Sequence, residues 1–176
     1  MKYIMKFGRL YTEQSSVPLA RIMSNLVGAV KMIYLQDDIP ALKTDICNNT
    51  NTEKNCGDVR SRLYILIDRD NRKIAVAYPD YADGEDPNLT GWPICRLPRV
   101  DHATITICDS NYMLTMHNSQ NYSLVDEKSN EVLRITHRGI SGGWIIVDQN
   151  NFAPEVLCGL FIFCRYMEQE NELLIV

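Results

Sequence analysis

The most apolar stretch of the sequence, residues 155–167 (EVLCGLFIFCRYM), restricts the possible folds more than any other feature. From Val156 to Cys164 it contains no charged residue. A helix over this stretch is about 20 Å long, whereas the hydrocarbon core of a bilayer is about 30 Å thick. The segment is therefore too short to span a membrane. Its apolar side chains would cover every face of the helix, so the rest of the protein must enclose it.

The flanking residues favour a helix over about residues 154–168. Pro154 suits the first helical position, and Arg165 lies near the negative end of the helix dipole, where it can pair with Glu168 at i+3. Gly159 has no side chain, so we expect a strand backbone to approach the helix closely there.

Most of the remaining chain alternates between apolar and polar residues, which predicts β-strands. Two stretches, 64–77 and 122–135, form a weak internal repeat in which Tyr, Leu and Asp recur at matching positions, and 33–46 is a shorter version. Each predicts a hairpin with a polar turn of about five residues. The clearest strand signals are 63–67, 104–107, 112–116 and 144–147.

These two predictions fit together in one architecture. Hairpin strands need a core to face, and the apolar helix needs a wall on every side. A closed antiparallel β-barrel wrapped around a buried hydrophobic C-terminal helix meets both needs, and closure also removes exposed strand edges. The fold class is therefore mostly β.

Three segments resemble a known family: the start MKYIMKFGRL, the hairpin YSLVDEKSNEVLRITHRGISGGWIIV (122–147) and the end NNFAPEVLCGLFIFCRYME (150–168). They are similar to the tubby C-terminal-domain-like superfamily, which includes phospholipid scramblases and LURP-one-related proteins, and here to its small bacterial members. The resemblance implies a single domain over 1–176, with about twelve strands around a central helix at about 154–168. Tubby-type domains bind phosphoinositides through a basic pair on the barrel wall.

Charge and cysteine usage exclude some classes of protein. The formal net charge of −4 disfavours nucleic-acid binding. Lys6 and Arg9 interrupt the apolar N-terminal positions, so this segment is not predicted to be a secretory signal. We therefore expect reduced cysteines and a cytoplasmic location, with peripheral membrane association as an extension of it.

Catalytic chemistry is not indicated by any motif. The Gly-rich segment 138–144 lacks the GxGxxG spacing, and no serine lies in a GxSxG context. The acidic residues of the predicted loop 78–93 could bind calcium, but a solvated turn is the favoured reading; they are Asp80, Asp83, Glu85 and Asp86. The histidines lack metal-type spacing; they are His102, His117 and His137. We predict a non-enzymatic domain without catalytic residues, bound metal or cofactor.

One basic cluster, Arg69, Arg72 and Lys73, is the candidate binding site. Such a cluster can hold a phosphate headgroup by charge-assisted hydrogen bonds, although the interleaved Asp68 and Asp70 also fit an ordinary solvated turn. Since a helix fills the barrel, we expect binding on its outer surface.

The predicted function is accordingly a phospholipid-headgroup or small-ligand binding module. The alternative is a protein–protein interaction or scaffold domain that uses the polar stretch 48–58 and the long connection 78–93. The expected partners are anionic phospholipid headgroups or another protein, with no transmembrane segment.

Overall fold

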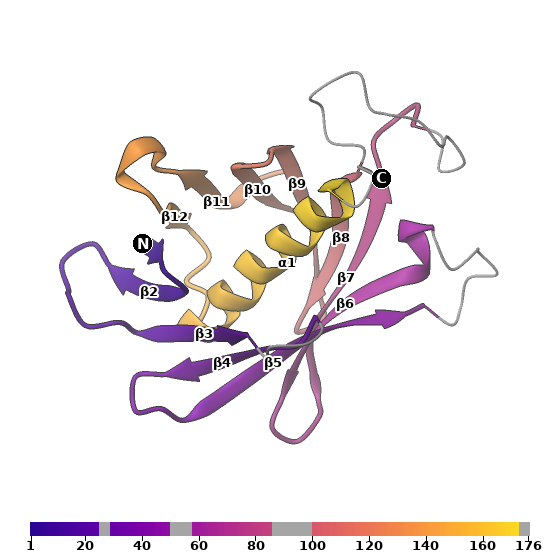
Figure 1. Ribbon diagram of the computed structural model, residues 1–176. Helices are drawn as coiled ribbons and strands as arrows, with labels where there is room; N and C mark the ends of the chain where they lie inside the picture. Colours follow the sequence, from indigo (N-terminus) through magenta and orange to yellow (C-terminus); the bar gives the residue numbers. More distant parts are fainter. Residues whose placement is uncertain (25–28, 50–57, 86–99, 173–176) are drawn as a thin grey trace.

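The computed structural model, which describes residues 1–24, 29–49, 58–85 and 100–172, is a closed antiparallel barrel (Figure 1). Each strand pairs with its neighbours in the chain, and β1 pairs with β12 to close the wall. The predicted closed barrel with a C-terminal helix is confirmed. The strands are β1 (Lys2–Lys6), β2 (Arg9–Thr12), β3 (Ala20–Ser24), β4 (Lys31–Leu35), β5 (Pro40–Asn48), β6 (Arg62–Asp68), β7 (Lys73–Tyr81), β8 (Val100–Ile107), β9 (Ser110–Asn118), β10 (Asn121–Asp126), β11 (Glu131–His137) and β12 (Trp144–Asp148).

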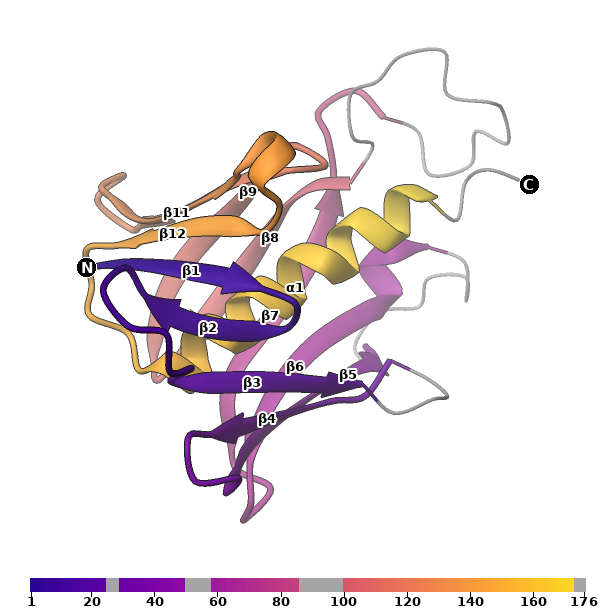
Figure 2. The same cartoon turned by 60° about the vertical axis from the view of Figure 1, so that its left-hand side comes forward.

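The helix α1 (Pro154–Glu172) runs through the barrel, as the apolar stretch predicted (Figures 1 and 2). It begins at the predicted residue and continues four residues beyond the predicted end at 168. Every residue from 157 to 164 is buried against the strands. The predicted pair of Arg165 with Glu168 forms. Among the described residues, no helix is both long and apolar enough to cross a bilayer.

Gly159 faces β6, but the prediction of a close strand backbone was wrong. A Cβ atom at this position would lie 2.7 and 2.8 Å from the two methyl carbons of Leu66. The space that glycine leaves is therefore filled by a side chain from the wall. Leu66 is fully buried in the same core.

The predicted repeat corresponds to two hairpins with the same turn. Asp68 accepts hydrogen bonds from the backbone N–H groups of Asp70 and Arg72, and Asp126 accepts the equivalent bonds from Lys128 and Asn130. Both turns contain four residues, one fewer than predicted, and place a residue with positive φ third. The shorter version of the repeat forms the turn between β4 and β5. It has the same two backbone hydrogen bonds, but no aspartate precedes the turn.

The long connection predicted at 78–93 begins later than expected. Residues 78–81 belong to β7 and pair with β8, with Pro79 opposite Ala103. The rest of this stretch, from residue 86, lies outside the described residues, as do 50–57 of the predicted loop 48–58. Asn48 is the last residue of β5.

Because successive strands alternate in direction, the turns divide between two ends of the barrel. One end of the barrel holds the C-terminal end of α1, the β1–β2 turn at residues 7–8 and the β11–β12 connection at 138–143 (Figure 2). The connection contains a 3-10 turn, η2 (Gly139–Ser141). The other end of the barrel holds the N-terminal end of α1 and the turns at 36–39, 69–72 and 127–130.

Gly143 fixes the β11–β12 connection against β1. A Cβ atom there would lie 2.5 Å from the carbonyl oxygen of Met5, and φ is +80°. We expect Gly143→Ala to lower the free energy of unfolding by about 1–3 kcal/mol more than Gly139→Ala. Gly139 is the matched control, since its φ is also positive but its Cβ would meet open space. Urea denaturation measures both, and equal losses would contradict the close approach.

Candidate functional site

The predicted basic cluster does not converge on one site. Arg72 donates from Nε to Asp68 at 2.8 Å and also bonds Asp70 at 3.1 Å, so two carboxylates of its own turn offset its charge. Lys73 stands on β7 opposite Ile67 of β6. Arg72 therefore pairs with the carboxylates of its own turn, although it lies next to the other cations in the sequence.

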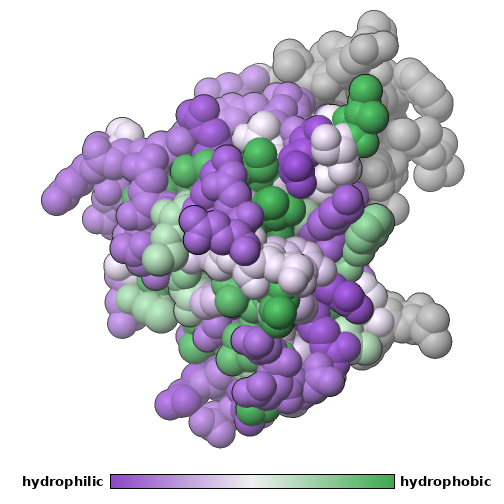
Figure 3. All heavy atoms as spheres, turned by 90° about the vertical axis from the view of Figure 1, so that its left-hand side faces the viewer, coloured by the Kyte–Doolittle hydropathy of each residue, from purple (hydrophilic) through white to green (hydrophobic). Residues whose placement is uncertain are grey.

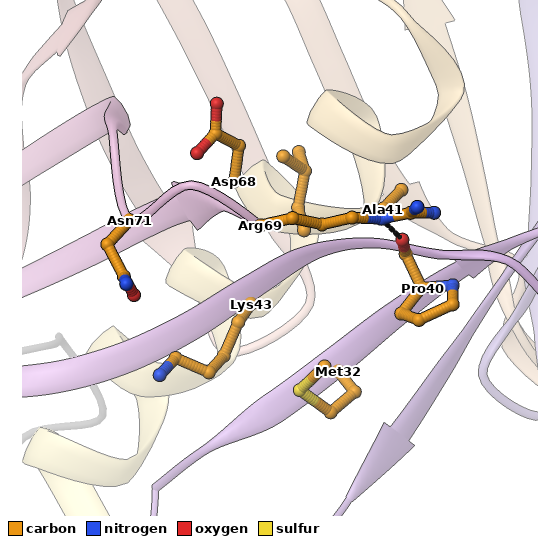
Figure 4. A pocket seen from close by; sticks show the side chains of 8 residues that line it. Met32, Pro40, Ala41, Lys43, Asp68, Arg69 and Asn71 are labelled. Atoms are coloured by element: carbon orange, nitrogen blue, oxygen red, sulfur yellow. Dashed lines mark hydrogen bonds between the residues drawn. The ribbon is translucent and has the colours of Figure 1, made fainter.

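Arg69 lines a pocket that lies over β4, β5 and β6 and has a volume of about 180 Å³ (Figure 4). Its Nε donates to the carbonyl oxygen of Pro40. Lys43 supplies a second cation to the lining, but Figure 4 shows the two side chains pointing in different directions. The pocket also includes Asp68, so its charge is mixed.

A second set of cations, Lys6, Arg9 and Arg21, lies in register across β1, β2 and β3; we call it the basic row. Lys6 pairs with Arg9, and Arg9 pairs with Arg21. Adjacent strands are about 4.8 Å apart, so the three backbone positions lie within about 10 Å. Their chain neighbours point inward and are buried: Met5, Leu10 and Ala20. The row therefore faces outward.

Few acids balance this row. Arg21 pairs with Asp38 at 2.9 Å and lies over the ring of Tyr34 at 4.9 Å. Lys6 and Arg9 form no ion pair with any described residue. Like charges opposite one another on neighbouring strands destabilise a sheet. A bound anion would offset this repulsion between neighbouring cations, so we expect such a row where an anion binds.

A pocket of about 310 Å³ adjoins the row between the connection after β2 and the β4–β5 turn. Its size falls within the usual range for small-ligand sites. The Nε of Arg21 is buried, yet no acceptor in the described chain bonds it. The lining consists of Arg9, Pro18, Ala20, Arg21, Leu35, Gln36 and Asp38.

Sequence reasoning missed the basic row because its members are separated along the chain and meet only through strand register. The usable signal was the absence of acids: residues 1–12 and 132–147 contain five Lys and Arg and no Asp or Glu. These two segments become neighbours when β1 pairs with β12.

The other predicted groups occupy structural positions. Asp80 lies in β7 and pairs with Arg60, while Asp86 is outside the described residues. His102 contacts Asp101, His117 contacts Ser123 at 2.8 Å, and His137 packs edge-on against Trp144. Within the described ranges, no group of three His, Cys, Asp or Glu side chains could hold a metal ion.

The described cysteines are free thiols: Cys47, Cys108, Cys158 and Cys164. Burial raises the pKa of the Cys158 and Cys164 thiols, so these two side chains act as small apolar groups in the core. Cys56 and Cys95 lie outside the described residues.

Comparison with known proteins gives no relative for this chain. No protein-family model matches it, and neither a curated protein nor a solved structure does so. The resemblance to the tubby-like superfamily therefore stays a prediction.

The turn at Asp68 gives a pH-dependent test. Hydrogen bonds from the backbone N–H of Arg72, its guanidinium and the N–H of Asp70 lower the pKa of Asp68. A carboxylate with a lowered folded-state pKa stabilises the fold above its ordinary value of about 4. This contribution is lost as the pH falls through the folded-state pKa.

We therefore expect Asp68→Asn to lower Tm at neutral pH and to make Tm less sensitive to acid. The difference from the wild type should disappear at the acidic end of a calorimetric pH series. Asp70→Asn is the control, because Asp70 accepts only one side-chain bond from Arg72. A constant Tm difference at every pH would contradict the assignment.

Proposed function

We propose that this protein is a non-enzymatic module that binds phosphate-bearing anionic lipid headgroups through the outer wall of its barrel. The observation that carries the proposal is the basic row, in which Lys6, Arg9 and Arg21 face outward in register and two of them have no ion-pair partner among the described residues.

The chemistry of the row suits phosphate. Guanidinium groups offer several N–H donors in a planar fork that matches phosphate oxygens, and charge-assisted bonds of this kind are stronger than neutral ones. Arg9 and Arg21 line the same pocket, and Arg21 retains a buried donor. A headgroup phosphate there would relieve the repulsion between the two arginines.

Several features favour the basic row over the predicted cluster. Arg72 is already offset by two carboxylates. The end of the barrel that carries Arg69 also carries acidic turns, with Asp109, Asp126 and Glu127 around one further pocket. These carboxylates would repel an anionic surface, whereas Lys6 and Arg9 face outward without an ion-pair partner among the described residues.

The same proposal includes the predicted family and location. A barrel around a central helix is the fold that the tubby-like resemblance implies, and we propose membership of that superfamily on this support. The anionic leaflet of a cellular membrane faces the cytoplasm, so the proposed partner agrees with a cytoplasmic, peripheral location.

Vesicle flotation tests the proposal. The wild type should float with phosphatidylcholine vesicles that contain phosphatidylserine and not with pure phosphatidylcholine. Each cation near an anionic surface contributes about 1 kcal/mol. The double variant Lys6→Ala, Arg9→Ala should therefore bind about 30-fold more weakly.

The matched control is Arg69→Ala with Arg72→Ala, which removes two cations at the other end of the barrel and should leave flotation nearly unchanged. Loss of binding in this control alone would move the site to the predicted cluster. Equal flotation with neutral and anionic vesicles, or none with either, would refute headgroup binding by the basic row.

A further inference from the structure

The side chain of Phe7 is not buried by the fold. It occupies the two-residue turn between β1 and β2 and is 91% exposed. Its φ is +50°, in the left-handed region that Asn, Asp and Gly adopt readily in such turns. A bulky residue with this φ is a genuine outlier, and such outliers gather at functional sites.

Ile140 is the second fully exposed apolar side chain at this end of the barrel. It stands on the 3-10 turn η2 and has a relative exposure of 108%, so no described residue covers it. Gly139, which precedes it, and Gly142, two residues after it, would meet nothing within 4 Å if they carried a Cβ atom. The turn therefore projects from the wall.

The two turns are neighbours although they lie far apart in the sequence. Met5 pairs with Trp144, and a Cβ atom at Gly143 would lie 3.2 Å from the Cβ of Lys6. Figure 2 shows both turns at the end of the barrel that holds the C-terminal end of α1. Figure 3 looks onto the side that carries β1, β2 and β12, where apolar side chains emerge between hydrophilic ones.

Cations surround the two apolar tips. The ammonium group of Lys6 lies 5.4 Å from the ring centroid of Phe7. Arg9 follows the first turn directly, and Arg138 precedes the second. Among the described residues, Arg9 and Arg138 have no ion-pair partner. The surroundings of both tips are therefore positively charged.

We propose that Phe7 and Ile140 insert into the interface of an anionic bilayer while the flanking cations contact its headgroups, so that this end of the barrel faces the membrane. This inference rests on the proposed function and adds the depth and direction of binding. Apolar side chains next to cations match a surface that is negatively charged outside and apolar beneath.

The geometry favours a bilayer over a protein partner. A stable protein interface buries about 800 Å² on each side and contains a continuous apolar centre. Here the apolar groups are separate tips on two projecting turns, with charged side chains between them. Insertion of single side chains needs no flat complementary patch.

The test compares Phe7→Asn with Ile140→Ser against the wild type. Asn suits a positive φ, so the double variant should keep or exceed the wild-type Tm, and weak binding cannot be ascribed to misfolding. Flotation with phosphatidylserine-containing vesicles should weaken about tenfold or more, because apolar surface no longer leaves water. Binding of a soluble polyanion, inositol hexakisphosphate, should stay unchanged by calorimetry.

Matched controls and opposite outcomes keep the two proposals separate. Tyr78→Ser with Met113→Ser removes apolar side chains that are 45% and 37% exposed on β7 and β9, across the barrel from β1, and should not affect flotation. Unchanged flotation of the Phe7 and Ile140 variant would overturn insertion and leave headgroup binding intact. If the wild type binds neither vesicles nor the polyanion, the proposed function fails and insertion fails with it.

Discussion

The structure depends on the enclosure of α1 by its own barrel. Residues 157–164 of the helix are buried on every face, and the fully buried rings of Tyr64, Phe163 and Tyr166 pack where helix and wall meet. Within this core the hydroxyls of Thr44 and Tyr166 lie 2.8 Å apart and form a hydrogen bond. Since the helix occupies the centre of the barrel, the candidate recognition chemistry lies on the outer wall and its turns.

Closure of the wall also decides which outer residues meet. A helix enclosed on all sides requires β1 to pair with β12, and that pairing brings the first hairpin of the chain against the connection at 138–143. The backbone of Gly143 passes so close to the carbonyl of Met5 that a Cβ atom would lie 2.5 Å from its oxygen. Core packing thus brings the turn that carries Phe7 beside the connection that carries Ile140.

Local patterns could predict the helix, the hairpins and hence the barrel, because hydrophobic periodicity can be recognised within one continuous segment of the chain. The basic row could not be predicted in this way, since Arg21 meets Arg9 only through the register of β2 and β3. A local search for cations instead finds Arg72, whose neighbours along the chain, Asp68 and Asp70, offset its charge. Turn sequences concentrate both signs of charge, so clustering along the chain is a poor guide to a surface site here.

The net charge of −4 conceals an uneven distribution. Carboxylates gather on the turns near the start of α1, as in the pocket lined by Asp109, Asp126 and Glu127. Unpaired cations gather on the opposite side of the wall, around Lys6 and Arg9. Lys6 and Arg9 have no ion-pair partner among the described residues, so they give the wall around β1 and β2 a local positive charge. In the proposed binding mode, this local positive charge would meet the headgroups although the net charge of the whole chain is negative.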